Sequence, residues 1–228
     1  MKKKILSLLA IMAFCCSAQA QTSQAYWRIY PKIGLALMKF PNDKIYISDD
    51  SEYTLKSRYK QGFTAGVEIG YEKGNVGFQI GLMYANKGTK YSDFKHETQK
   101  ETEKVEGVQY TLHYLEMPLT ASISIARGLS IKAGVQPGYL LNARYMENIV
   151  TTAYEKDGSW KIVSAKETDE PATDTFKRFA LSIPVGLSYE IRDIIIDARY
   201  VIGVTSNSEY FSTRNSGFLF TVGYGFDL

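Results

Sequence analysis

The sequence is poor in the residues that form redox, metal and phosphate-binding sites. Both cysteines, Cys15 and Cys16, lie in the first 20 residues, which resemble a removable leader. A chain that begins after this leader has no thiol and no disulfide, which excludes redox chemistry and cysteine metal sites. The only histidines, His96 and His113, are too far apart in the sequence for ligand spacing. Glycine-rich phosphate loops that open a helix are also missing, and we expect no cofactor and no metal.

Long apolar runs are scarce as well. The apolar run from Ile5 to about Cys15 is shorter than the roughly 20 residues of a membrane-spanning helix. It follows three lysines and precedes Ser17-Ala18-Gln19-Ala20, the small-x-small pattern of a cleavage site. We therefore expect a cleaved signal peptide over residues 1–20 and one domain over residues 21–228. A lipoprotein signal is a weaker alternative, because Phe14 and Cys15 precede Cys16 in place of a small residue.

The chain also lacks a charge imbalance beyond its leader. It has 27 basic and 24 acidic residues, and the leader contains three of the basic ones, Lys2, Lys3 and Lys4. The remaining chain is neutral overall, so its charge gives no reason to expect nucleic acid as a partner.

What the sequence does contain is alternation with period two, which places every second residue on one face of a strand. Phe218, Phe220 and Val222 alternate with residues that are mostly small or polar, and the same pattern recurs along the chain. It predicts eight strands, near residues 27–39, 59–72, 76–88, 109–126, 129–145, 176–190, 194–205 and 215–228. Tight turns at 73–75, 127–128 and 191–193 alternate with longer loops at 40–58, 89–108, 146–175 and 206–214. This alternation of connections is typical of an outer-membrane barrel.

The composition of the less apolar face indicates which face meets lipid. That face is mainly Gly, Ala, Ser and Thr, with a few charges at mid-strand, which suits the narrow interior of a barrel of about eight strands. We therefore predict an all-β fold, a single antiparallel up-and-down transmembrane barrel, with the apolar face in contact with outer-membrane lipids. Aromatic residues near strand ends favour interfacial girdles, namely Tyr59, Tyr71, Tyr84, Tyr114, Tyr189, Tyr200 and Phe226. Pro118, Pro137 and Pro184 fall inside predicted strands, where we expect local bulges.

Several charges fall on the predicted interior face. We interpret Glu68, Glu116, Lys132, Asp197 and Arg199 as a structural charge cluster, because a polar interior must pair its buried charges. Counting from the tight turns places four of them at similar depth and Glu116 higher. Acid-base chemistry at such carboxylates is the alternative.

Three segments carry a resemblance to a known family. Residues 114–119 (Tyr-Leu-Glu-Met-Pro-Leu), residues 134–141 (Gly-Val-Gln-Pro-Gly-Tyr-Leu-Leu) and Asp197-Ala198-Arg199-Tyr200, followed by Gly203, resemble recurrent segments of the PorT-like outer-membrane β-barrel family, often labelled porin family protein. The resemblance covers essentially the whole predicted domain. It implies a barrel in the cell outer membrane and a part in a protein secretion and gliding apparatus.

The last predicted strand is similar to the signal by which the outer-membrane assembly machinery recognises its clients. Thr221, Gly223, Phe226 and Leu228 match that pattern, which more commonly ends in an aromatic residue. The resemblance implies the assembly machinery as a partner.

Function is less constrained than fold. We expect no enzyme and no catalytic residue, and a small barrel that acts in structure, assembly or interaction, with protein partners bound through its loops. The hypothesised main contact surface is the extracellular loop 146–175. The β-prone runs 149–154 and 160–163 flank the turn signal Asp157-Gly158 and predict a hairpin that extends the strands beyond the membrane. Lys166 to Asp174 predict an irregular acidic strap that follows the hairpin. One alternative is a lipid-modifying enzyme that uses His113 with Ser92 or Asp93. The other is a secreted soluble barrel that binds an apolar ligand.

Overall fold

The computed structural model describes residues 25–41, 44–48, 51–54, 56–97, 101–154, 160–208 and 214–228. The predicted signal peptide and the predicted Asp157-Gly158 turn lie outside the described residues. The described chain is almost entirely antiparallel strand, apart from one short 3₁₀ helix, η1 (Thr173–Thr175). Within this part of the chain there is no helix long and apolar enough to cross a membrane.

Eight antiparallel strands, with β7 (Glu101–Glu116) and β8 (Leu119–Ala126) counted as one interrupted strand, close into a barrel. This confirms the predicted fold class and strand number. In order around the ring the strands are β1 (Tyr26–Lys39), β4 (Ser57–Lys73), β5 (Val76–Tyr91), β7 continued by β8, β9 (Leu129–Tyr154), β11 (Phe179–Ile191), β12 (Ile194–Gly203) and β13 (Ser216–Tyr224). The ring closes where β1 pairs with β13 and with the short β14 (Phe226–Asp227). Closure removes the unpaired strand edges that lipid would not tolerate.

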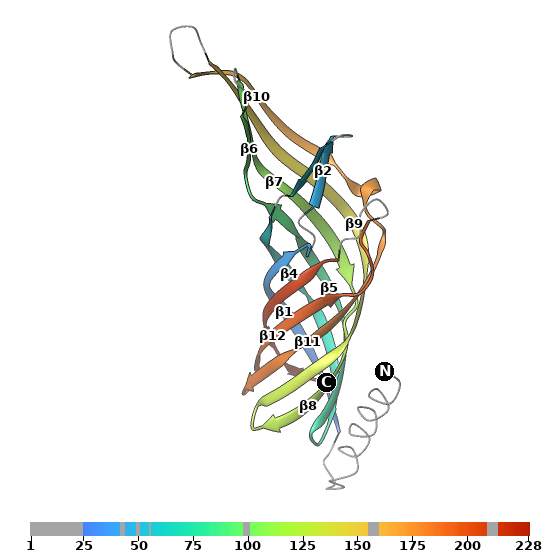
Figure 1. Ribbon diagram of the computed structural model, residues 1–228. Helices are drawn as coiled ribbons and strands as arrows, with labels where there is room; N and C mark the ends of the chain where they lie inside the picture. Colours follow the sequence, from blue (N-terminus) through green and yellow to red (C-terminus); the bar gives the residue numbers. More distant parts are fainter. Residues whose placement is uncertain are drawn as a thin grey trace, which may run out of the picture.

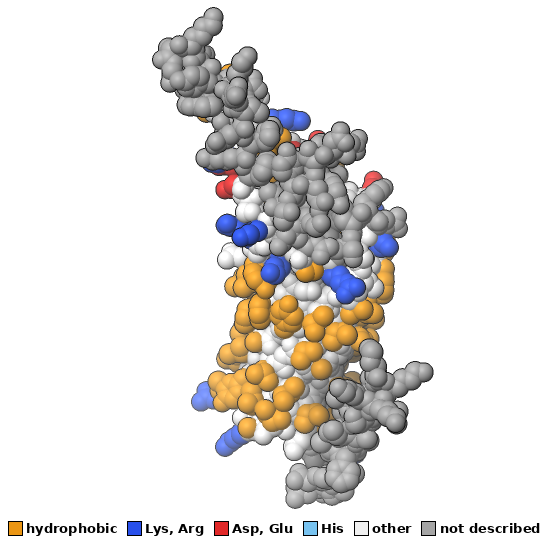
Figure 2. Space-filling view, viewed as in Figure 1, with side chains coloured by type: hydrophobic (Ala, Val, Ile, Leu, Met, Phe, Trp, Pro, Cys, Tyr) orange, Lys and Arg blue, Asp and Glu red, His pale blue; other side chains and the backbone are white. Residues whose placement is uncertain are grey.

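Strict alternation of exposed and buried side chains shows which face points outward. In β12 the odd-numbered Asp197 and Arg199 are buried, whereas Ile196, Tyr200 and Ile202 are exposed. The same holds around the ring, so the apolar face is the outer one. Figure 2 shows these apolar side chains gathered in a band, with Lys and Arg side chains at both of its edges. Such a band, bounded by cations that can meet lipid headgroups, is the surface expected of a membrane-spanning barrel.

The expected bulges at the three prolines are absent. Pro137 and Pro184 lie in strands whose register with the neighbouring strand is unbroken, and Pro118 separates β7 from β8 without shifting the register with β9. Proline costs the sheet one N–H donor, and here the ladder between β9 and β11 simply omits the pairs at Ile183 and Pro184. The sheet accommodates the missing N–H donor by leaving out these pairs, and not by the extra residue of a bulge.

Two of the predicted loops are largely strand. β9 runs for 26 residues, beyond the barrel strand predicted to end at residue 145, and pairs with the upper part of β7 as far as Glu101. Its upper end also pairs with residues 160–171, which confirms the strands predicted at 149–154 and 160–163. β6 (Phe94–Glu97) and β10 (Trp160–Pro171) flank this pair, so a four-stranded sheet rises from one side of the barrel (Figure 1). The prediction of an irregular strap from Lys166 was wrong, because the continuing edge of β9 offers hydrogen bonds to β10 as far as Pro171. We call β6, β7, β9 and β10 the extracellular sheet.

The predicted loop 40–58 contains another small hairpin. β2 (Lys44–Ser48) and β3 (Ser51–Thr54) pair with each other and form a sheet separate from the barrel. The opposite end of the barrel contains the three tight turns, with Gly74, Gly128 and Arg192 at positive φ, and the C-terminal residues, where Gly225 donates to Asp193 of one of these turns. Short turns face the periplasm in outer-membrane barrels, which orients the chain.

One predicted girdle residue was wrong. Tyr114 is 2% exposed and points into the barrel, whereas the other six proposed girdle aromatics lie on the outer surface. Tyr114 shares the even-numbered parity of the buried Glu116 on the same strand, and this parity decides its direction.

Candidate functional site

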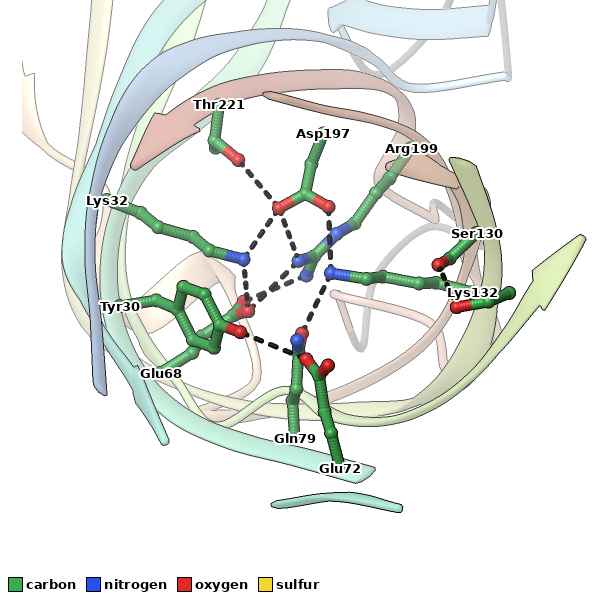
Figure 3. A network of polar contacts seen from close by, with 11 residues as sticks. Tyr30, Lys32, Glu68, Glu72, Gln79, Ser130, Lys132, Asp197, Arg199 and Thr221 are labelled. Atoms are coloured by element: carbon green, nitrogen blue, oxygen red, sulfur yellow. Dashed lines mark hydrogen bonds and ion pairs between the residues drawn. The ribbon is translucent and has the colours of Figure 1, made fainter. Parts of the chain in front are cut away.

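Five charged side chains from four strands meet in the middle of the barrel interior (Figure 3). Arg199 donates to both carboxylate oxygens of Glu68, at 2.9 and 3.1 Å, and to Asp197 at 3.0 Å. Lys32 Nζ lies 2.5 Å from Glu68 Oε2 and 2.6 Å from Asp197 Oδ2. Lys132 Nζ reaches the other oxygen of Asp197 at 3.0 Å. We call these five residues the central ionic network.

The charges of the central ionic network are buried and compensate one another. None of its side chains is more than 3% exposed. A lone charge at such a place would be very costly, and mutual pairing with further hydrogen bonds makes it tolerable. Gln79 accepts a hydrogen bond from Lys132 at 2.9 Å, and Thr221 donates to Asp197 at 3.4 Å. The arrangement holds opposite walls of the barrel together and closes its middle.

The structure brings four of the five sequence-selected charges together and separates the fifth. Glu68, Lys132, Asp197 and Arg199 belong to the central ionic network, whereas Glu116 lies elsewhere in the interior. Glu116 accepts a hydrogen bond from Lys87 Nζ at 2.5 Å and another from Gln136 at 2.7 Å.

The sequence analysis did not select the cations that complete these pairs. Lys32 and Lys87 are both buried, and so is Arg28, which pairs with Glu190, Asp193 and Asp227 at the periplasmic end. A signal was available for β1, since Arg28, Tyr30 and Lys32 occupy alternate positions and must therefore share a face.

The extracellular half of the interior is filled by an apolar plug. Phe40, Leu112, Tyr114, Leu140 and Phe176 form one buried cluster there, with Ala143 and Ala172. The rings of Phe40 and Phe176 lie 6.0 Å apart, although 136 positions separate the two residues in the sequence. Side chains thus fill the barrel at two levels, as expected for about eight strands.

The residues considered for catalysis are not brought together. His113 lies opposite Asn86 on β5 and contacts the hydroxyl of Tyr84 at 2.5 Å. Ser92 lies six residues after Asn86 in the sequence, just beyond the end of β5. Asp93 accepts a hydrogen bond from the amide of Gly107. The side chain of His96 lies outside the described residues. In the described ranges, moreover, no group of three His, Cys, Asp or Glu residues has the arrangement of a metal site.

The residues of the proposed assembly signal lie where the ring closes. Thr221 and Gly223 on β13 pair with Gly34 and Lys32 of β1. Phe226 pairs with Ile29, and the amide of Leu228 donates to the carbonyl of Trp27 at 3.0 Å. The side chains of Phe226 and Leu228 face outward and are 51% and 74% exposed.

Three solved structures that match the chain are distant from it in sequence. Neisserial surface protein A is 13% identical, with 87% of this chain and 97% of that chain covered and a TM-score of 0.43. Ail, the attachment invasion locus protein of Yersinia pestis, solved with the heparin analogue sucrose octasulfate, is 14% identical, with coverages of 88% and 99% and a TM-score of 0.42. The translocator domain of the autotransporter NalP from Neisseria meningitidis is 10% identical, with coverages of 99% and 96% and a TM-score of 0.29. No curated protein matches the chain.

A family model gives the assignment that these structures do not. The model described as outer membrane protein beta-barrel domain matches residues 19–209, which is most of the chain. The match agrees with the closed ring, the outward apolar band and the paired charges inside. The chain therefore belongs to the outer membrane protein beta-barrel domain family and lies in the cell outer membrane.

Proposed function

We propose that this protein is an interaction component of the outer membrane that binds protein partners through its extracellular sheet. The observation that carries the proposal is the continuation of the strands beyond the apolar band. β9 has 26 residues, whereas roughly 9 to 11 tilted residues cross the hydrocarbon. A rigid sheet that projects from the membrane presents binding residues better than a mobile loop does.

The exposed strand β10 supplies the surface for such contacts. Ile162 and Val163 are 63% and 56% exposed and lie away from the lipid band, where an apolar contact of a partner can cover them. Among the described strands β10 pairs with β9 alone, so it is an edge strand of the sheet. Both features favour a protein partner over a small solute.

The interior supports the same proposal by being closed. The central ionic network and the apolar plug occupy it at two levels, so passage of solutes is disfavoured. The resemblance to PorT-like proteins favours a protein secretion apparatus as the assembly in which the partner resides.

The test is to replace residues 149–168 with a short Gly-Ser linker. This change spares Ala172 and Thr173, which bond to the backbone of Ala143 at the barrel rim. The matched control replaces residues 44–54, the hairpin of β2 and β3, because these two strands form a sheet separate from that of the barrel. We expect both variants to form heat-modifiable barrels, and only the first to lose the function assayed by complementation of a deletion strain.

Secretion is measured in the same strains by comparing the proteins released into the medium. Full complementation by a folded 149–168 replacement would exclude this sheet as the working surface. Normal secretion in the deletion strain itself would exclude the secretion apparatus as the assembly in which the partner resides. The role of the extracellular sheet in binding would still be tested by the complementation assay.

A further inference from the structure

The periplasmic half of the barrel interior contains a cavity of about 230 Å³. Its mouth lies between the tight turns at Gly74, Gly128 and Arg192, and Lys132 of the central ionic network lines its inner end. The cavity is therefore closed at its inner end and opens to the periplasm, on the side of the membrane opposite the extracellular sheet.

The cavity exists because one wall of the barrel is built from small residues. β5, β8, β9 and β11 contribute Gly77, Ser122, Ser130 and Ser188 to its lining. The facing strand β1 fills its own part of the interior with large side chains, Arg28, Tyr30 and Lys32. A barrel of this size is normally filled by side chains, so the small wall is a local departure from that rule.

Apart from the exposed Arg192 at the mouth, the charged groups at the cavity already have partners. Lys132 pairs with Asp197, and Glu190 pairs with Arg28. Glu72 accepts hydrogen bonds from the hydroxyls of Tyr26 and Tyr30, at 2.6 and 3.0 Å. At the inner end of the cavity, away from Arg192, a charged ligand would have to displace one of these partners or leave its own charge uncompensated, and so a charged ligand is disfavoured there.

Four serine hydroxyls at the cavity have spare hydrogen-bonding capacity. Ser122 and Ser188 are only 8% and 4% exposed, and within the described residues neither side chain makes a hydrogen bond. Ser124 and Ser130 also line the cavity and bond only to each other, at 3.1 Å, so each keeps further capacity. The hydroxyls of Ser122 and Ser188 are not among the enclosed side-chain atoms that lack a partner, so they face the cavity, where a ligand can bond to them.

We propose that this cavity binds a neutral polyhydroxylated molecule of monosaccharide size from the periplasm. Each hydroxyl group of such a ligand can both donate and accept hydrogen bonds, and so can each serine hydroxyl of the cavity. Tyr26 at the lining is 44% exposed and offers a ring face against which a sugar can lie. The volume lies just below the range of about 300–1,000 Å³ of drug-sized pockets, which sets the limit to one sugar ring.

The test uses the isotope-labelled full chain in detergent micelles, titrated with glucose and with N-acetylglucosamine. We expect saturable changes in the amide resonances of Gly77, Ser122 and Ser188 with at least one of them. The variant Ser122→Ala with Ser188→Ala should weaken that binding at least about tenfold, the effect of losing a ligand hydrogen bond. Ser182→Ala is the matched control, because Ser182 is a buried serine on β11 that bonds to the backbone of Gln136, away from the cavity.

Glucose 6-phosphate and glucosamine provide the charged comparison, and both should bind more weakly than the neutral sugars. The proposal is overturned by the absence of saturable changes with either neutral sugar in the wild-type chain. It is also overturned if the double variant binds as tightly as the wild type, or if a charged analogue binds best. Because the wild-type titration needs no mutation, a misfolded variant does not remove the test.

Discussion

Arg199 on β12 and Glu68 on β4 face each other across the barrel interior and form a bidentate ion pair, with N–O distances of 2.9 and 3.1 Å. The pair joins residues 131 positions apart in the sequence and ties two walls that are not neighbours in the ring. Its removal should weaken the whole barrel.

We expect Arg199→Met to lower the free energy of unfolding by about 3–5 kcal/mol, the usual cost of breaking a buried pair. Glu68→Gln should cost at least as much, since it leaves three cations around Asp197 alone. Urea titration in phospholipid vesicles measures both. Arg144→Met is the control, because its pair with Asp169 is exposed and should contribute no more than about 1 kcal/mol. Equal midpoints for all three variants would argue against a stabilising network.

Deleting residues 226–228 should prevent insertion, because this end pairs with β1 and carries the assembly-like pattern. Gly223→Val should act in the same direction. A Cβ atom at Gly223 would lie 2.6 Å from Lys32 Cγ and 2.8 Å from the carbonyl oxygen of Pro31. Leu228→Phe should insert normally, since it restores the more common aromatic ending. Heat-modifiable barrel in outer-membrane fractions is the readout, and its normal level after the deletion would contradict the prediction.

The purified barrel should show no steady ion conductance in planar lipid bilayers. Phe176→Ala should remain non-conducting, because the central ionic network closes the barrel below the apolar plug. The same variant should lose about 3–5 kcal/mol of stability from the emptied plug. Stable conductance of the wild-type chain would show that the two levels do not seal the interior.

Stability should fall at alkaline pH through the tyrosines of the extracellular sheet. Burial, together with the negative charge of Glu147, raises the pKa of Tyr110 to about 12 from its usual value near 10. The folded state therefore holds the phenol proton more tightly than the unfolded state, and its contribution is complete below about pH 10 and lost between about pH 10 and 12. Tyr110→Phe should reduce this loss in unfolding titrations across the window. An identical alkaline slope in the variant would contradict the assignment.

Much of the barrel follows from local pattern alone. Period-two alternation determines strand identity and the inward or outward direction of each side chain, because successive Cβ atoms must point to opposite faces of a sheet. The tight turns of two or three residues determine which strands are consecutive neighbours. Charges such as Glu68, Asp197 and Arg199 can therefore be assigned to the interior without a structure.

Tertiary structure decided how those side chains meet. Arg199 and Asp197 share a strand, but only the closure of the ring brings Lys32 and Glu68 to them. Glu116 pairs with Lys87 because it lies at another height along β7. Residues 101–108 and 146–154 have no strong alternation, and they become strand because β7 and β9 continue to satisfy each other's backbone groups above the membrane. The apolar plug likewise needs Phe40 and Phe176 from distant segments. These contacts depend on register and closure, which are properties of the whole sheet and are not encoded in any single strand.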